Sequence, residues 1–408
     1  MCYNRGCMIL VHLSLTNFRN FVRLELDLPP GPILLVGANA QGKTSLLEAV
    51  HYLSGARAAH APFDRQLINF LALLEPLPFA RLEADVKDGG INTHLDIRLI
   101  ASPKDAPTEA RTRKEVLING VKRHSPDLAQ AMKTVLFLPR DMHVIEGPPS
   151  ERRHHLDTVL CQADAAYAQT LAEYGKVLSQ RNALLKQLHD RGSDGDQLAF
   201  WDERLTDLAS TLIRSRALAL EELQRIAARI HLDLTRGAET LRLHYQPSYD
   251  PVTLSHGQLG LDLEAQVDWT HLTRHAIRNG MRASLQRMRA EEIARGMTLT
   301  GPHRDDYVPY ANGLDLRLYG SRGQNRTTML TLKLSEVDWL QERTGKWPVL
   351  LLDEVLAELD PEHRGSLLAR VHSVHQAILT AADLAMFSGD FQRQATLWRV
   401  SSGTVAAA

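Results

Sequence analysis

The sequence predicts an α/β protein in which a mainly helical second lobe is inserted into a discontinuous α/β domain. Strand patterns occur in residues 9–37 and 80–123, with a helical segment between them, and α/β character returns in the last hundred residues. Between them, from Ser150 to about Arg236, the chain is rich in Leu, Ala, Arg, Gln and Glu and is almost free of Gly and Pro. At 408 residues the chain exceeds one compact core of ordinary size, so two lobes are expected.

The composition is that of an ordinary globular protein and excludes two classes. Three cysteines, Cys2, Cys7 and Cys161, make no disulfide framework, which favours a reducing compartment. No apolar run reaches the roughly 18–20 residues that span a bilayer, and no signal peptide follows the start. We therefore expect a cytoplasmic protein with no membrane partner. The net charge of −1 neither indicates nor excludes a nucleic-acid partner, because a local basic surface is enough.

The N-terminal elements follow from periodicity. Residues 9–28 alternate like strands, and "PILLVG" is a short buried strand that ends at Gly37. "TSLLEAVHYLSG" has the apolar spacing of a helix and stops at Gly55. Residues 80–123 read as strands, with "DGG" and "NG" as turns.

The remaining elements complete the two lobes. Residues 150–236 predict two long helices joined at "RGSDGD", 191–196, and residues 264–295 predict another helix. "WPVLLLDEV" and "HQAILTAAD" are buried strands near the C-terminus. The predicted boundaries are the α/β domain at 8–149 and 296–400, the helical lobe at 150–295, and flexible ends at 1–7 and 401–408.

"GANAQGKT" matches the P-loop pattern G-x-x-x-x-G-K-[ST] and lies between the expected strand and helix. Glycines let backbone N–H groups face phosphate oxygens, the lysine supplies a charge to the β- and γ-phosphates, and the hydroxyl is a Mg²⁺ ligand. Lys43 is therefore predicted to be catalytic and Thr44 to bind Mg²⁺ with ATP. The phosphate-binding set is Gly37, Ala38, Asn39, Ala40, Gln41, Gly42, Lys43 and Thr44.

An acidic strand end supplies the second half of such a site. "VLLLDE" is an apolar strand followed by two carboxylates, Asp353 and Glu354. We expect Asp353 to help hold Mg²⁺ and Glu354 to polarise the attacking water as a general base. Two adjacent acids favour ATP hydrolysis over small-molecule phosphorylation.

A second phosphate-type loop, "SRGQNRT", starts another helix. Ser321 can cap that helix, Gly323 permits close approach of a ligand, and Gln324 can donate a hydrogen bond. With the P-loop, "VLLLDE" and then "AELDPEH", the order is that of ABC-type ATPases. That resemblance implies that Ser321, Gly323 and Gln324 bind the γ-phosphate held by another subunit, with Asp360 at the same seam.

A narrower resemblance runs from about Met8 to Asp383. The chain resembles the RecF family of SMC/Rad50-like ABC ATPases. The segments that carry it, in order, are "LSLTNFRNF", "GANAQGKTSLLEAVHYLSG", "GPPSERRHHLD", "SQRNALLK", "TLTGPHRDD", "SRGQNRT", "LKLSEVDWL" and "VLLLDEVLAELD".

The resemblance implies a weak, DNA-coupled ATPase of recombinational repair and replication maintenance. Such a protein dimerises on ATP and binds double-stranded DNA and junctions between single and double strands. It also implies partnership with RecR and, through RecO, the loading of RecA, with support of the SOS response. Three departures from the family pattern bear on ATP hydrolysis and on nucleotide sensing. Ala56-Arg57-Ala58 replaces a Gly-Arg-Ser stretch, with His60 in place of a further arginine. Ala357 replaces a serine, and Ala382 replaces a sensor threonine or histidine. No Q-loop glutamine can be placed.

Local basic residues are candidates for contact with DNA phosphates, which would make binding sensitive to salt. They are Arg111, Arg113, Lys114, Lys122 and Arg123 on a strand-rich hairpin, and Arg152 and Arg153 at the start of the helical lobe. Solvated surface charge is the competing interpretation for each cluster. "GPHRDD" is interpreted as a structural element of the family, with a metal site as the weaker alternative.

Three other functions fit the sequence less well. A nuclease of the OLD type needs a further acidic domain. A structural tether of the SMC/Rad50 type needs a coiled coil of hundreds of residues, whereas the helical region here is about 85 residues long before its next strand. A transporter ATPase lacks the family segments quoted above.

Overall fold

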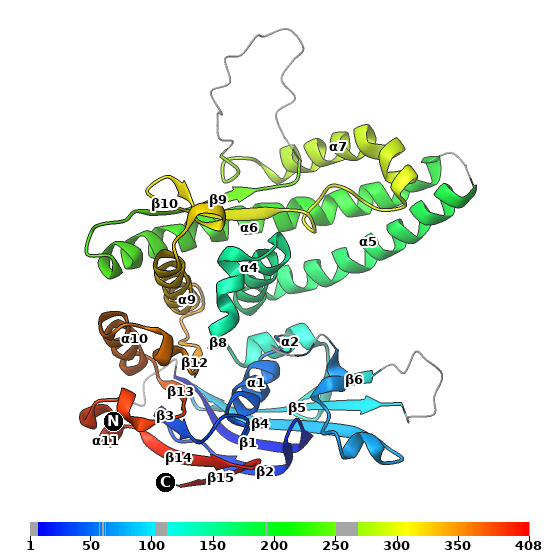
Figure 1. Cartoon of the computed structure of the whole chain (residues 1–408). Helices are drawn as coiled ribbons and strands as arrows, with labels where there is room; N and C mark the ends of the chain where they lie inside the picture. The colour runs from blue at the N-terminus through cyan, green and yellow to red at the C-terminus, as the bar shows by residue number, and fades with distance from the viewer. Residues whose placement is uncertain are drawn as a thin grey trace. The chain divides into compact units, whose positions relative to one another are not determined.

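The computed structural model describes residues 7–56, 58, 61, 63–102, 112–191, 195–249 and 268–407 (Figure 1). The chain divides into two compact units. The head unit is made of residues 1–141 and 330–408, and the helical unit is made of residues 142–329. The expected α/β class is present, with a helical unit inserted into it. Among the described residues, none of the helices has both the length and the apolar character that a membrane crossing requires.

The predicted boundary at 295 is wrong. The structure assigns residues 296–329 to the helical unit, because β10 (Asp306–Ala311) pairs antiparallel with β9 (Leu241–Gln246) along its whole length. The first boundary is close to the expectation, with Met142 in place of Ser150. The helical unit therefore also contains the segment 321–324 that was expected in the head.

The head unit contains an antiparallel sheet with the strand order β2-β1-β4-β5-β6-β7. Its alternating pattern leaves one face buried, as the sequence predicted for residues 9–28 and 80–123. The strands are β1 (Met8–Phe18), β2 (Phe21–Asp27), β4 (Phe79–Asp88), β5 (Ile91–Ala101), β6 (Thr112–Ile118) and β7 (Val121–Arg123).

A second head sheet carries the P-loop and the acidic strand end, in the order β15-β14-β3-β13-β12-β8. All its pairings are parallel except β14 with β15. Every residue of β12 and β13 is buried, which explains why apolar residues dominate both strands without alternation. The strands are β3 (Gly31–Val36), β8 (Thr134–Phe137), β12 (Val349–Asp353), β13 (Gln376–Ala381), β14 (Thr396–Ser401) and β15 (Thr404–Ala407).

Helix α1 (Lys43–Leu53) contacts strands of both head sheets. Its apolar residues, among them Leu46, Leu47 and Val50, share one core with the inner faces of the two sheets. This packing fixes the helix start at the end of β3. The other head helices are α2 (Ser125–Ala131), α10 (Pro361–Ser373) and α11 (Gly389–Gln394), with short 3-10 turns at Asp64–Leu67, Ala72–Leu74, Pro139–Met142, Val355–Glu358 and Leu384–Met386.

The helical unit is built on α5 (Ala165–Arg191) and α6 (Ala199–Leu234), which contact each other and α7 (Arg274–Arg295). A break at Asp164 separates α5 from α4 (Pro149–Ala163). The Asp164 carboxylate accepts hydrogen bonds from the N–H groups of Ala166 and Tyr167, at 2.8 and 3.2 Å. Asp164 thus starts a new helix as an N-cap, where the sequence predicted one continuous helix.

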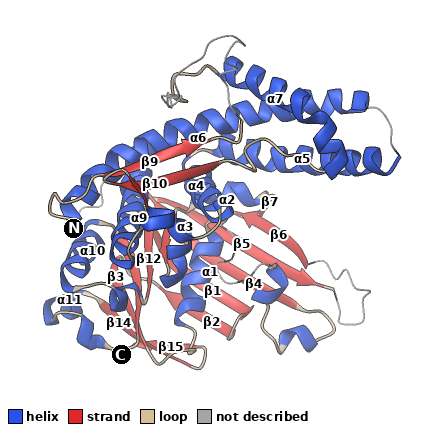
Figure 2. Ribbon diagram, turned by 45° about the horizontal axis from the view of Figure 1, so that its top comes forward, coloured by secondary structure: helices blue, strands red, loops and turns tan. Residues whose placement is uncertain are grey.

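A small sheet, β11-β10-β9, completes the helical unit, and β9 contacts α6 (Figure 2). Helix α9 begins at Arg322 in this unit and ends at Thr344 in the head. The remaining elements are α3 (His143–Glu146), the 3-10 turn Gly195–Leu198, β11 (Leu314–Asp315) and α8 (Leu316–Tyr319).

The predicted flexible C-terminal end is also corrected. Ser401 and Thr404–Ala407 belong to the paired strands β14 and β15. The two residues between them, Ser402 and Gly403, have φ of 46° and 74°, which is the conformation of a tight hairpin turn. Residues 1–6 and 408 lie outside the described part of the chain.

Candidate nucleotide-binding site

The P-loop follows β3 and leads into α1, as the sequence predicted. Two of its glycines are required by close approach. A Cβ on Gly42, where φ is 116°, would lie 2.4 Å from Asn20 Nδ2. A Cβ on Gly37 would lie 2.3 Å from the carbonyl oxygen of Val400. Any larger side chain at either position would displace the loop.

Lys43 is held within the loop by three oxygen partners. Its side chain is only 3% exposed, and Nζ donates to the carbonyl oxygens of Gly37 at 2.7 Å and Ala38 at 3.0 Å. A Glu354 carboxylate oxygen lies 3.0 Å from the same ammonium. The structure therefore joins the predicted phosphate lysine to the predicted general base.

Asp353 is the centre of a group of hydroxyls. The Thr44 hydroxyl donates to its carboxylate, at 2.9 and 2.8 Å from the two oxygens. The Thr380 hydroxyl donates to the same carboxylate at 2.8 Å and accepts the N–H of Glu354 at 2.9 Å. Thr380 was not predicted. It lies opposite Asp353 in the parallel register of β12 and β13, and only that pairing reveals it.

These groups suit Mg²⁺. The hydroxyl of Thr44 and the carboxylate of Asp353 are hard oxygen ligands, which Mg²⁺ prefers, together with water and phosphate oxygens. They already lie in contact, beside the loop that would hold the phosphates. The donor set therefore fits the metal that the sequence predicted at these two residues.

A pocket of about 620 Å³ opens beside the loop. One wall is the P-loop and Glu354. The other was not predicted as part of the site: it comes from the β1–β2 turn and the segment after α1, and its residues are Arg19, Asn20, Gln66, Ile68, Asn69, Phe70 and Leu71. The signal for Arg19 was present, because "TNFRN" is one of the family segments. Arg19 makes paired hydrogen bonds to Glu48, at 2.8 and 3.0 Å.

The segment Ser321–Gln324 forms a reciprocal helix cap. Ser321 Oγ accepts the N–H of Gln324 at 3.2 Å, and Gln324 Oε1 accepts the N–H of Ser321 at 3.0 Å, which is a capping box. Gln324 Nε2 donates to Glu239 at 2.9 Å. A Cβ on Gly323 would meet only Ser321 Oγ, at 3.9 Å. The helix-cap interpretation is thus confirmed, and the phosphate-binding role stays a prediction.

Asp360 also caps a helix. It accepts the N–H groups of Glu362 and His363, at 3.0 and 3.1 Å. The hydrogen bond from the His363 N–H, with that from its side chain, holds the pKa of Asp360 below its usual range. The departing residues Ala357 and Ala382 are both exposed. Arg57 and His60 lie outside the described residues.

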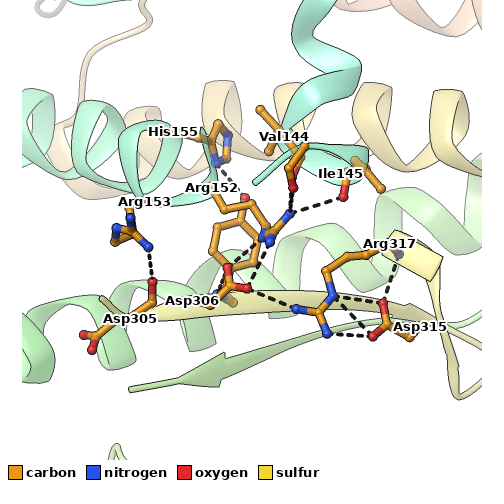
Figure 3. A network of polar contacts seen from close by, with 11 residues as sticks. Val144, Ile145, Arg152, Arg153, His155, Asp305, Asp306, Asp315 and Arg317 are labelled. Atoms are coloured by element: carbon orange, nitrogen blue, oxygen red, sulfur yellow. Dashed lines mark hydrogen bonds and ion pairs between the residues drawn. The ribbon is translucent and has the colours of Figure 1, made fainter. Parts of the chain in front are cut away.

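The prediction that Arg152 contacts DNA is wrong. Its side chain is 2% exposed and forms a bidentate ion pair with Asp306, at 2.7 and 2.9 Å. It also donates to the carbonyl oxygens of Val144, Ile145 and Gly147. Arg317 joins the same carboxylate at 3.0 Å (Figure 3). The nitrogen atoms of the Arg152 guanidinium thus all bond to residues of the helical unit.

Arg153 is half-buried and donates to the carbonyl oxygen of Asp305 at 2.7 Å (Figure 3). The metal alternative for "GPHRDD" gains no support, since the described part of the chain holds no group of three or more His, Cys, Asp or Glu side chains able to bind a metal. His303 instead accepts a hydrogen bond from the Tyr174 hydroxyl at 2.7 Å.

The other DNA candidates, on the β6–β7 hairpin, differ in their exposure to solvent. Lys122 and Arg123 are exposed, and Arg113 is exposed and paired with Glu115. Lys114 differs, because its ammonium lies 3.9 Å from the centre of the Tyr52 ring and burial lowers its pKa to about 8. Arg111 lies outside the described residues. Within the described part of the chain, Lys122 and Arg123 are therefore the exposed candidates that form no ion pair with a carboxylate.

The parallel sheet, the P-loop and the acidic strand end define the chain as an ABC-type P-loop ATPase. The family described as RecF/RecN/SMC N terminal domain matches residues 9–404. Proteins named DNA replication and repair protein RecF are similar over nearly their whole length. The relative from Roseiflexus castenholzii is 40% identical, and the match covers 97% of this chain and 99% of the relative. The relative from Chloroflexus aurantiacus is 38% identical, and the match covers 98% of this chain and 99% of the relative. The chain belongs to the RecF family.

Solved structures agree with this assignment. A recombination mediator protein RecF with ATP, described as part of the RecFOR pathway, superposes with a TM-score of 0.84 at 29% identity. A recombination mediator protein RecF with ATPrS superposes with a TM-score of 0.83 at 28% identity. Each match covers 100% of both chains.

Proposed function

We propose that the protein is an ATP-dependent DNA clamp of recombinational repair and replication maintenance, and that it hydrolyses ATP weakly. The observation that carries the proposal is the joined set of Lys43, Thr44, Asp353 and Glu354, which come from two segments far apart in the sequence. Lys43, Thr44 and Glu354 line one pocket, and Asp353 is hydrogen-bonded to Thr44. Binding of ATP by a solved relative that covers the whole chain supports the nucleotide.

Each residue has a role in this proposal. Lys43 leaves the carbonyl oxygens of its own loop and binds the β- and γ-phosphates. Thr44 and Asp353 would hold Mg²⁺, which would supply positive charge beside the phosphates. Glu354 accepts a proton from the attacking water. Thr380 keeps the Asp353 carboxylate in place through the hydrogen bond described above.

Ser321, Gly323 and Gln324 act on the nucleotide of a second copy, with Asp360 at the same seam. Support comes from their exposure: Ser321 and Gly323 are exposed at the first turn of α9, where backbone N–H groups and the helix dipole favour an anion. Two copies of the chain then enclose two nucleotides, and hydrolysis reopens the dimer. Ala357 and Ala382 stand where the family has polar residues, which favours slow hydrolysis.

The partners follow from the family. We propose binding to double-stranded DNA and to junctions of single and double strands, with Lys122 and Arg123 as phosphate contacts. We also propose binding to RecR, promotion of RecA loading on gapped DNA with RecO and RecR, and support of SOS induction. The cytoplasm, at the nucleoid, is the proposed location.

The size of the Glu354→Gln protein tests the clamp. Loss of the general base should trap the ATP-bound state, so a dimer is expected with ATP and Mg²⁺ and a monomer without them. Light scattering after size-exclusion chromatography measures the mass. Lys43→Ala is the matched control, because it should remain monomeric in both conditions. A Glu354→Gln monomer at saturating ATP would contradict the proposal.

A further inference from the structure

The tight turn between β14 and β15 lies against the outer side of the P-loop. Ser402 donates its N–H to Gln41 Oε1 at 2.7 Å, and Gly403 donates its N–H to the Gln41 carbonyl oxygen at 3.1 Å. Asn20, from the β1–β2 turn, donates to the same carbonyl at 2.9 Å. Gln41 is therefore held at both its side chain and its backbone by two other segments of the head unit.

These contacts leave no free space. A Cβ on Gly403 would lie 2.4 Å from the carbonyl oxygen of Asn20. Gly37 lies similarly close to Val400, and Gly42 lies similarly close to Asn20. Both ends of the P-loop thus lie in van der Waals contact with the β14–β15 hairpin or with Asn20.

The geometry of the peptide group gives these contacts a consequence for the site. In a trans peptide the C=O and the following N–H point in opposite directions. Two donors, Gly403 N–H and Asn20 Nδ2, fix the direction of the Gln41 carbonyl, and neither Gln41 nor Gly403 is among the residues that line the pocket. The N–H of Gly42 is therefore fixed on the opposite side, and Gly42 lines the pocket. Backbone N–H groups of a P-loop are the groups that bind phosphate.

We propose that the β14–β15 turn and Asn20 form a positioning element for the P-loop, which holds its N–H groups in the phosphate-binding arrangement before nucleotide arrives. The proposal rests on the proposed nucleotide site and adds to it the residues Ser402 and Gly403, which are not among the residues that line the pocket. A loop ordered in advance binds more tightly, because less conformational freedom is lost on binding. A turn that only closed a hairpin would need no hydrogen bond to Gln41.

The test is the affinity for ADP, measured with a fluorescent ADP analogue. Gly403→Ala should weaken it about tenfold, because the added methyl group pushes Asn20 and the turn away from Gln41. Gly345→Ala is the matched control: its φ of 71° is close to the 74° of Gly403, but a Cβ there meets nothing within 4 Å. The control should bind ADP within about twofold of the wild-type chain. Both variants place alanine at a similar positive φ, so the control accounts for the backbone strain and the remaining difference in ADP affinity reports the contact with Asn20.

A second variant covers the case in which Gly403→Ala does not fold. Gln41→Met keeps the length of the side chain but removes the acceptor for Ser402, and should weaken ADP binding about fivefold. If both Gly403→Ala and Gln41→Met bind ADP like the Gly345→Ala control, the positioning role is wrong while the nucleotide site stands. If the wild-type chain itself does not bind ADP, the proposed function and this inference are overturned together.

Discussion

Glu354→Gln should tighten the binding of ATP to the head unit before any dimer forms. In the structure the Glu354 carboxylate lies 3.0 Å from Lys43 Nζ, and Lys43 is nearly inaccessible to solvent. A lysine that binds phosphate must weaken or give up this ion pair. The amide in Glu354→Gln holds the ammonium less strongly, so less is lost when nucleotide arrives.

The magnitude follows from the surroundings of the pair. A hydrogen bond to a charged group contributes about 1.5–3 kcal/mol. The Glu354 side chain is 35% exposed, so solvent screening reduces the contribution to about 1 kcal/mol. Lys43 keeps its bonds to two loop carbonyls in both proteins. We therefore expect about fivefold tighter ATP binding and a thermal midpoint without nucleotide lower by about 2–4 °C.

The assay is a titration of monomeric protein with a fluorescent ATP analogue, at low protein concentration, combined with thermal unfolding without nucleotide. Removal of a negative charge also favours an anionic ligand in general. A double-mutant cycle with Lys43→Met in the unfolding experiment isolates the pair itself. The reasoning is refuted if the cycle gives no coupling and the affinity of Glu354→Gln for ATP equals that of the wild-type chain.

Three further outcomes are expected. Arg152→Ala should destabilise the helical unit by about 2–3 kcal/mol, because Asp306 loses its bidentate partner and keeps only Arg317. An unchanged thermal midpoint would contradict this. Burial lowers the pKa of His303 to about 4, so the unfolded chain binds a proton at a higher pH than the folded chain does. The free energy of unfolding should therefore decrease as the pH is lowered from about 6.5 to about 4. His303→Gln should reduce this pH dependence in thermal unfolding, and an unchanged pH dependence would exclude His303 as its source. Lys122→Ala and Arg123→Ala should each weaken the binding of double-stranded DNA and reduce the salt dependence of that binding by about one phosphate contact, with an unchanged thermal midpoint. If both variants keep the wild-type affinity, this hairpin does not contact DNA.

The P-loop and the acidic strand end could be predicted because each depends on one short stretch of sequence. The P-loop needs a strand, eight residues and a helix in succession. The strand before Asp353 is apolar throughout because both its faces are buried. Thr380 could not be found in this way. Its contact with Asp353 depends on the parallel register of β12 with β13, and no local pattern specifies that register.

The error at Arg152 has a different cause. Charged residues are mostly exposed, so Arg152 was assigned to a DNA surface. Its helical periodicity gave the opposite indication, since His155, Leu156 and Val159 lie three, four and seven residues further on and are all buried with it. A charge on the apolar stripe of a helix indicates a buried partner, and Asp306 is that partner. The acid lies 154 residues away, so its identity required the structure.

The position of β3 in its sheet has a consequence for biosynthesis. Both strands that flank β3, namely β13 and β14, come from residues 376–401. A growing chain folds from its N-terminus, yet the apolar strand that ends in the P-loop has neither neighbour until those residues leave the ribosome. The nucleotide pocket is therefore completed among the last steps of synthesis. An incomplete chain exposes an unpaired apolar strand, which makes it a substrate for chaperones and proteases before it can bind nucleotide.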